Sequence, residues 1–147
     1  MTDTVKVLPP EEQICFALYS ASRSLTALYR DLLAPLGVTY PQYLVLLTLW
    51  DAGTLSVGTL GKRLQLDSGT LSPLLRRLEQ AGLVSKGRSA TDERVVEISL
   101  TPAGDALRSE APRISDAVCG STGLAIEDLI QLQAQVSALA ERVRSVA

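Results

Sequence analysis

The sequence contains no histidine, only two cysteines and few aromatic residues, which make up 4% of its 147 residues. Without histidine the chain cannot carry a Ser-His-Asp or Cys-His catalytic site or a histidine-based metal site, and two cysteines alone cannot build a typical structural zinc site. We therefore expect no enzyme of these classes, no metal and no cofactor. The scarcity of aromatic residues beside 46% hydrophobic content favours helices over a β-sandwich or barrel.

Long hydrophobic runs are also missing. No stretch of about 18 or more uncharged apolar residues is present, so we expect no transmembrane helix and no membrane partner. The segment Met1–Pro10 lacks the basic-then-apolar pattern of a secretory signal, which makes a cytoplasmic location the expectation. Because that compartment keeps thiols reduced, a structural disulfide between Cys15 and Cys119 is not expected, although a redox-active pair stays open.

Charge is unevenly distributed along the chain, although the net charge is only −2. Residues 62–94 carry seven basic and four acidic side chains, a net charge of +3, which leaves −5 on the rest of the chain. This asymmetry predicts one basic face on an otherwise acidic body, as in a nucleic-acid-binding protein.

Hydrophobic periodicity predicts two helices in the first part of the chain. The first begins at Pro10, with acidic residues in its first turn, and ends near Leu36–Gly37. The second begins at Pro41 and is apolar on nearly all sides over residues 43–50, which is typical of a helix buried in the centre of a domain.

A short helix, a tight turn and a longer helix follow. Ser56 is the expected N-cap of a helix over 57–64, and Asp67 or Ser68 caps the longer helix, which ends at Gly82. Two short strands, 83–86 and 94–100, flank a polar hairpin loop over 87–93. Further helices begin at Thr101–Pro102 and near Ile126.

This order of elements is that of a winged helix-turn-helix. We predict a mainly α fold with one small β-hairpin wing, in a single domain over residues 1–147. The DNA-binding part spans about 38–104. The flanking segments, about 9–36 and 105–147, form amphipathic helices with little of their own domain to pack against, which predicts a homodimer.

The predicted DNA contacts lie on the longer helix and on the hairpin. Small hydroxyl residues and a glycine in the first helical turn can approach base edges, and arginines further along can reach phosphates. A hairpin arginine can enter a narrow minor groove, held by a nearby carboxylate. The candidates are Ser68, Gly69, Thr70, Ser72, Arg76, Arg77, Arg88, Asp92 and Arg94.

A cysteine and three tyrosines form a second candidate site. Cys15 and Tyr19 share one side of the first helix, whereas Tyr29 lies about 21 Å further along its axis. Tyr29 can therefore approach Cys15 only from a partner chain whose first helix crosses antiparallel near Ser22. That arrangement can also bring the partner's Tyr40 beside Cys15. Phenols that donate to a thiolate lower the thiol pKa and favour its oxidation by a peroxide to a sulfenic acid. The apolar neighbours Ile14, Phe16 and Leu18 favour an organic hydroperoxide as the oxidant. From spacing alone, an inert buried Cys15 is an equally good interpretation.

Cys119, which follows a polar bend, is the only thiol in the chain that can resolve such a sulfenic acid into a disulfide. The alternative is a small core residue near a helix end.

Several stretches resemble the organic-hydroperoxide-sensing branch of the MarR family. They are 15–23 (CFALYSASR), 36–45 (LGVTYPQYLV), 66–75 (LDSGTLSPLL) and 92–96 (DERVV), and the resemblance covers most of residues 8–110. It implies a dimeric repressor on a palindromic operator in double-stranded DNA. Cys15 is then the peroxidatic residue, and its oxidation releases the DNA and derepresses a thiol peroxidase gene.

The resemblance also implies individual roles. Cys119 of the partner subunit matches the resolving cysteine of two-cysteine members, and Gly87 stands where members often have a basic residue. The tyrosines around the thiol match Tyr19, Tyr29 and Tyr40, and the DNA contacts match Ser68, Thr70, Arg77, Asp92 and Arg94.

Two alternatives to a redox-switched repressor remain. One is a repressor of the same fold that is released by a small phenolic or aromatic ligand, with Cys15 incidental. The other, a thiol peroxidase, is disfavoured because the sequence lacks a thioredoxin-like βαβ pattern.

Overall fold

The computed structural model describes residues 6–147, so part of the Met1–Pro10 segment discussed above lies outside the described residues. The chain divides into two compact units, Met1–Ala111 and Pro112–Ala147. The second unit contains α6 (Ala111–Thr122) and α7 (Ile126–Val146). The elements of the first unit are η1 (Pro10–Glu12), α1 (Ile14–Leu33), η2 (Ala34–Leu36), α2 (Tyr40–Ala52), β1 (Leu55–Ser56), α3 (Val57–Leu64), α4 (Ser68–Gln80), β2 (Val84–Arg88), β3 (Val96–Leu100), α5 (Pro102–Ala106) and η3 (Leu107–Glu110).

Helix α2 is the core of the first unit, as the apolar residues on nearly all sides of 43–50 predict. Thr39 caps it in a reciprocal box, in which the Thr39 hydroxyl accepts from the Gln42 backbone N–H and the Gln42 side chain accepts from the Thr39 N–H. The helix buries seven of its thirteen residues, including Val45, Leu46 and Leu49. The predicted central helix is therefore confirmed.

The helix-turn-helix forms where the sequence predicts it. Ser56 caps α3 and Asp67 caps α4, each accepting a hydrogen bond from a backbone N–H in the first helical turn. Between the helices Gln65 adopts a left-handed conformation with φ of 57°. Apolar side chains from both helices fix the pair against the core, and the completely buried ones are Leu60, Leu71, Leu75 and Leu78.

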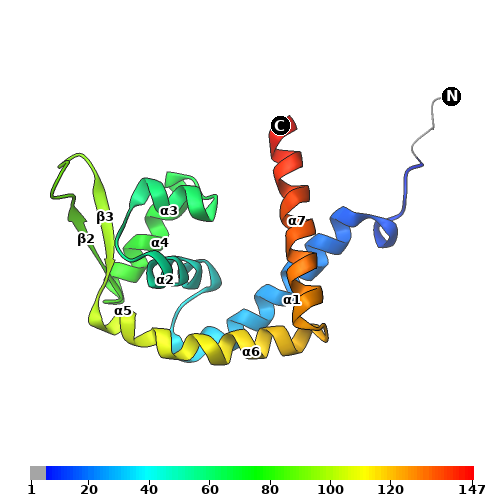
Figure 1. The fold of residues 1–147 in the computed structure, drawn as a ribbon, viewed down its shortest axis with the longest axis horizontal. Helices are drawn as coiled ribbons and strands as arrows, with labels where there is room; N and C mark the ends of the chain where they lie inside the picture. The colour runs from blue at the N-terminus through cyan, green and yellow to red at the C-terminus, as the bar shows by residue number, and fades with distance from the viewer. Residues whose placement is uncertain (1–5) are drawn as a thin grey trace. The chain divides into compact units, whose positions relative to one another are not determined.

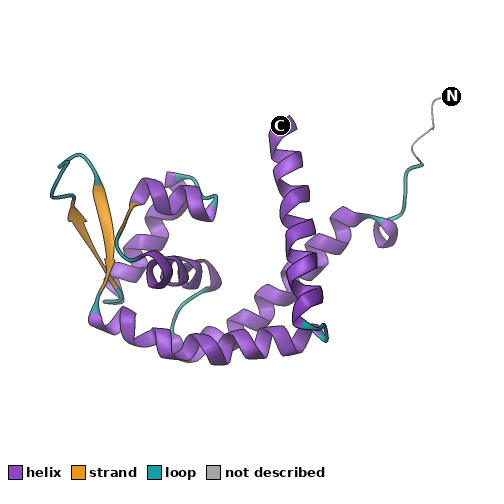
Figure 2. Ribbon diagram, viewed as in Figure 1, coloured by secondary structure: helices purple, strands orange, loops and turns teal. Residues whose placement is uncertain are grey.

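The wing belongs to a three-stranded antiparallel sheet in the order β1-β3-β2. In β3, Ile98 pairs with Lys86 of β2 and with Leu55 of β1, and it is fully buried. The two-residue strand β1 is too short for sequence periodicity to reveal and was not predicted. Figures 1 and 2 show the β2–β3 hairpin beside the group formed by α2, α3 and α4.

Two local predictions were wrong. The first α-helix begins at Ile14 rather than Pro10, because Pro10–Glu12 form a separate 3-10 turn and Gln13 is extended. Cys119 does not follow a bend: it lies inside α6, which continues to Thr122 and ends before Gly123.

The terminal helices bury few side chains. In α1 only Leu33 is buried, and α7 has no buried residue, as the sequence analysis expects. Within residues 6–147 no helix by itself has the length and apolar character to cross a membrane; Ile14–Leu36 and Tyr40–Ala52 reach that threshold only as a pair bent by 71°.

Candidate nucleic-acid interface and thiol site

The first turn of α4 presents the small polar residues that were predicted to contact DNA. Ser68, Gly69, Thr70 and Ser72 are all exposed, while the opposite face of the helix is buried. Asp67 holds this turn by accepting the Thr70 backbone N–H at 2.8 Å. That bond, then one from the Thr70 hydroxyl, lowers the pKa of the Asp67 carboxyl below its usual value. A charged cap therefore fixes the end of the helix that can face base edges.

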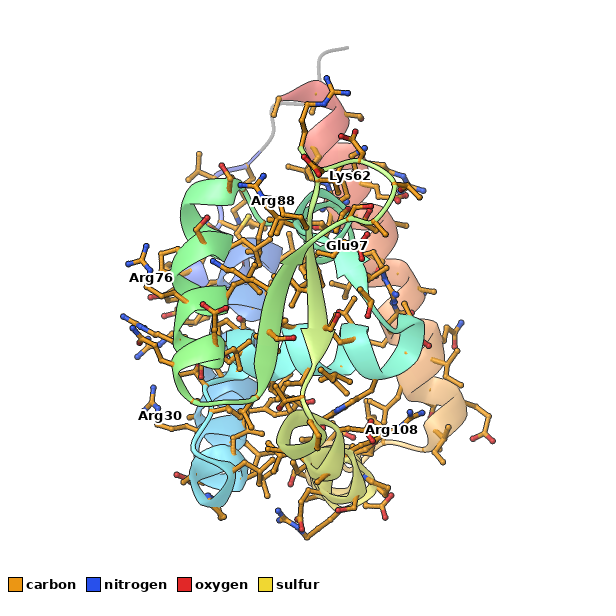
Figure 3. The ribbon with its side chains drawn as sticks, turned by 90° about the vertical axis from the view of Figure 1, so that its left-hand side faces the viewer. Arg30, Lys62, Arg76, Arg88, Glu97 and Arg108 are labelled. Carbon is orange, nitrogen blue, oxygen red and sulfur yellow. The ribbon has the colours of Figure 1, made fainter. Side chains whose placement is uncertain are left out.

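Two arginines continue this exposed face. Arg76 and Arg77 lie two turns further along α4, and both are exposed. Figure 3 shows Arg76 pointing outward from the helix, and Arg88 near the tip of the hairpin. Arg76 and Arg77 can therefore contact the phosphates of a nucleic acid that lies alongside α4.

The loop of the wing is ordered by its own hydrogen bonds. Arg88 Nη1 donates to the Glu93 carbonyl at 2.9 Å, and the Ser89 N–H donates to the Val95 carbonyl at the same distance. Arg94 donates twice to Asp92 Oδ1, from Nε at 3.2 Å and from its backbone N–H at 3.1 Å. The predicted Asp92–Arg94 pair is thus confirmed. The Arg94 side chain is 91% exposed, so its guanidinium stays accessible to a ligand although it pairs with Asp92.

An open groove separates α4 from the inner face of the hairpin. Its floor and walls include the first residues of α3, which the sequence analysis did not select, and the side chain of Lys86. The groove is lined by Ser56, Val57, Gly58, Ser72, Leu75, Lys86, Arg94, Val95 and Val96. Only the pairing of β2 with β3 reveals this position of Lys86, because a charge count alone cannot show which face of a strand it occupies.

Both thiols are exposed on the chain. Cys15 lies in the first turn of α1 and Cys119 in the last turns of α6, and each is a free cysteine. Neither is a buried core residue of its own subunit, so that interpretation of each cysteine was wrong.

Two of the three predicted tyrosines, Tyr29 and Tyr40, pack against each other. The rings of Tyr29 and Tyr40 lie 4.4 Å apart between centroids, and Tyr43 continues the cluster 6.1 Å from Tyr29. Burial raises the pKa of the Tyr40 phenol, and it raises that of Tyr43 with a further contribution from Tyr40, so both stay protonated donors at neutral pH. Tyr19 is separate: its exposed ring lies 5.4 Å beneath the Arg23 guanidinium.

Sequence and structure comparisons agree with this arrangement. The model of the MarR family matches residues 38–96. The chain is 48% identical over 131 residues to the organic hydroperoxide resistance transcriptional regulator of Bacillus subtilis (strain 168), covering 89% of each chain. It is 39% identical over 123 residues to the HTH-type transcriptional regulator MgrA of Staphylococcus aureus, covering 83% of this chain and 84% of that one.

The fold is also similar to solved structures of AbfR, a protein of Staphylococcus epidermidis. Reduced AbfR bound to DNA superposes with a TM-score of 0.77 at 33% identity, over 92% of this chain and 93% of that one. The winged helix-turn-helix of the first unit is therefore the fold of a DNA-bound regulator. On this evidence, the chain belongs to the MarR family of transcriptional regulators.

Proposed function

We propose that this protein is a homodimeric repressor that binds a palindromic operator and releases it when an organic hydroperoxide oxidises Cys15. The observation that carries the sensing part is the exposed Cys15 thiol on the helix that also bears Tyr29, whose ring packs on Tyr40. The first turn of α4 enters the major groove, with Arg76 and Arg77 on phosphates, and Arg94 enters the neighbouring minor groove, oriented by Asp92.

The second subunit covers the apolar faces that one chain leaves exposed. Ile14 is 60% exposed on α1, and Ile126 and Ile130 are 68% and 63% exposed on α7. Exposed apolar side chains on two long helices favour association with a second copy. Antiparallel first helices that cross near Ser22 bring each Cys15 to the partner's tyrosine cluster, because the helix continues without interruption from Cys15 to Tyr29.

The chemistry follows from that contact. Tyrosine hydroxyls of the partner donate to the Cys15 thiolate, which attacks one oxygen of the hydroperoxide. A sulfur–oxygen bond forms, the oxygen–oxygen bond breaks, and the alkoxide takes up a proton and leaves as an alcohol. The Cys119 thiol of the partner subunit then attacks the sulfenic acid, so that a disulfide forms and water leaves. The new bond changes how the two subunits sit, and the paired α4 helices no longer match the operator.

Support for this chemistry comes from the relatives. The Bacillus subtilis relative is an organic hydroperoxide resistance regulator, and AbfR has been solved in a disulfide-formed state at 34% identity to this chain, with a TM-score of 0.65. Gly87 stands where the family often has a basic residue, so the cations nearest to the tip of the wing are Arg88 and Arg94.

The decisive experiment compares the wild type with Cys15→Ser and Cys119→Ser. Operator-bound protein is treated with cumene hydroperoxide, release is followed by fluorescence anisotropy, and the products are identified by non-reducing mass spectrometry. We expect the wild type to release DNA and form an interchain Cys15–Cys119 disulfide, and Cys15→Ser to stay bound. Normal release by Cys15→Ser ends the redox proposal. A mixed disulfide with an added thiol in place of the Cys15–Cys119 bond assigns the resolving step to an external thiol.

A second candidate function rests on a small cleft at the α1–α2 junction. Arg30 and Tyr40 line it together with Thr26, Val38 and Thr39, a combination that suits a small aromatic acid. In this alternative, an aromatic acid releases the operator from the wild type and from Cys15→Ser equally, whereas hydroperoxide releases neither.

A further inference from the structure

The groove between α4 and the hairpin is lined by an exposed cation, Lys86, which lies on the same face of β2 as the buried Val84. Lys86 pairs directly with Ile98 across the antiparallel β2–β3 ladder, and residues that face each other in such a pair point to the same side of the sheet. Ile98 is fully buried on the inner side, as is Val84, two residues before Lys86 on the same face. Lys86 therefore occupies the inner side of the wing, toward α3 and α4.

Within the described residues, no anionic group pairs with the Lys86 side chain. Among residues 6–147, the Lys86 ammonium has no hydrogen-bond or ion-pair partner, and no carboxylate is among the side chains that line the groove. The nearest acidic residue along β3 is Glu97, which pairs with Gly87 and so points to the opposite face of the sheet. Lys86 is exposed, so water solvates its ammonium in the free protein, and the cation is available to an anion that enters the groove.

We infer that Lys86 binds a backbone phosphate of the DNA strand that crosses this groove. The inference deepens the proposed function and rests on it. If α4 enters a major groove and the tip of the wing enters the adjacent minor groove, the strand that separates those two grooves has to pass between α4 and the hairpin. The groove is that passage. Ser72 on one wall and Lys86 on the other are a hydroxyl and an ammonium, both of which donate to phosphate oxygens.

Gly58 keeps the passage open. A Cβ added at Gly58 meets only the Ser56 hydroxyl, at 4.0 Å, so the fold does not require glycine there. Its backbone is exposed at the start of α3, and a larger side chain at this position would enter the groove. Gly58→Leu therefore places a large side chain in the groove without destabilising the fold, because leucine is a better helix former than glycine.

The test measures how salt weakens DNA binding. A duplex enriched by the wild-type protein from a random-sequence pool, and a scrambled duplex of equal length, are titrated under reducing conditions at several KCl concentrations. Each phosphate contact contributes about 0.9 to the slope of log affinity against log salt. We expect Lys86→Gln to reduce the slope by about one for each subunit. It weakens binding to both duplexes by the same factor, because a phosphate contact carries no sequence information.

Matched variants separate a contact from a general charge effect. Arg108→Gln removes the same charge from an exposed site that Figure 3 shows at the far end of the first unit from Arg88, and it keeps the wild-type slope. Lys86→Arg keeps the slope as well. Gly58→Leu weakens binding although every cation is present. Thermal melting checks that each variant is folded.

The outcomes distinguish the two levels of the proposal. If the wild type enriches no duplex, the proposed function fails and the assignment of Lys86 falls with it. If the wild type binds and Lys86→Gln keeps the wild-type slope, or Gly58→Leu binds as tightly as the wild type, the inference alone is wrong.

Discussion

The indole Nε1 of Trp50 in α2 donates a 3.1 Å hydrogen bond to the carbonyl oxygen of Gly104 in α5, across 54 residues of sequence. The same glycine packs directly against the Leu83 carbonyl group at the start of the wing, so closely that a Cβ at position 104 would overlap that oxygen. Thr101 completes the junction by donating from its hydroxyl to the Gly82 carbonyl at 2.6 Å. Helix α2, helix α5 and the residue that precedes β2 therefore meet at one glycine.

We predict that Gly104→Ala destabilises the protein by about 2–4 kcal/mol, because the backbone has to move away from Leu83 and the Trp50 bond is weakened. Trp50 is the only tryptophan, so its fluorescence reports both this junction and urea unfolding. Gly87→Ala is the matched control, since a Cβ there meets nothing within 4 Å. A wild-type unfolding midpoint for Gly104→Ala would show that the junction is not as tight as described.

The helix-turn-helix and the buried α2 were predictable because their signals are local. Ser56, Asp67 and Gly82 mark helix ends by their own chemistry, and the apolar run over 43–50 indicates burial without any knowledge of neighbours. The Asp92–Arg94 pair was predictable for the same reason, since the partners are two positions apart in the sequence.

The cap of α4 predicts a pH dependence. The pKa of Asp67 is lowered in the folded protein by hydrogen bonds from Thr70, so the carboxylate form stabilises the fold. This contribution is complete above the ordinary pKa of an aspartic acid, about 3.9, and is lost as the pH falls through the lower folded value. Asp67→Asn can still cap the helix but does not ionise. We expect the melting temperature of the wild type to exceed that of Asp67→Asn at pH 7, and the difference to shrink below about pH 4. A difference that stays constant down to pH 2.5 would contradict the role of the charge.

The tyrosine cluster predicts how the stability of the fold changes at alkaline pH. Burial raises the pKa of Tyr40, so the protonated phenol is the form that the fold favours. Stability is unaffected below the ordinary tyrosine pKa of about 10 and falls as the pH rises above it, because the unfolded chain ionises more readily. We therefore expect the melting temperature of Tyr40→Phe to fall less than that of the wild type when the pH is raised from 9 to 11. Tyr19→Phe, which alters an exposed ring, is the control and should follow the wild type.

Non-local relationships could not be predicted from the sequence. Strand β1 exists only because Leu55 pairs with Ile98, 43 positions later in the sequence. The spacing of residues along the chain does not predict the contact between the Tyr29 and Tyr40 rings, because the rings belong to different helices joined by a 3-10 turn. The inward position of Lys86 depends on its register with Ile98, which a single strand sequence does not specify.

The wing supplies the last prediction. Asp92 restrains an Arg94 side chain that is otherwise almost fully exposed, so the pair contributes at most about 0.5 kcal/mol to folding but holds the guanidinium in one orientation. A released side chain of this length has to be immobilised again on binding, at a cost of about 0.5–1.5 kcal/mol, which corresponds to roughly a twofold to twelvefold loss of affinity per subunit. We therefore expect Asp92→Ala to melt like the wild type but to bind the enriched duplex more weakly.

Asp92→Asn separates charge from geometry, because an amide oxygen can still accept the two Arg94 hydrogen bonds. We expect its affinity to lie between those of Asp92→Ala and the wild type. Arg94→Lys keeps the cation but not the planar fork, and should lose most where the bound duplex is A·T-rich and its minor groove narrow. If Asp92→Ala binds as tightly as the wild type, the pair does not organise the wing for DNA, and Arg94 acts as a freely moving charge.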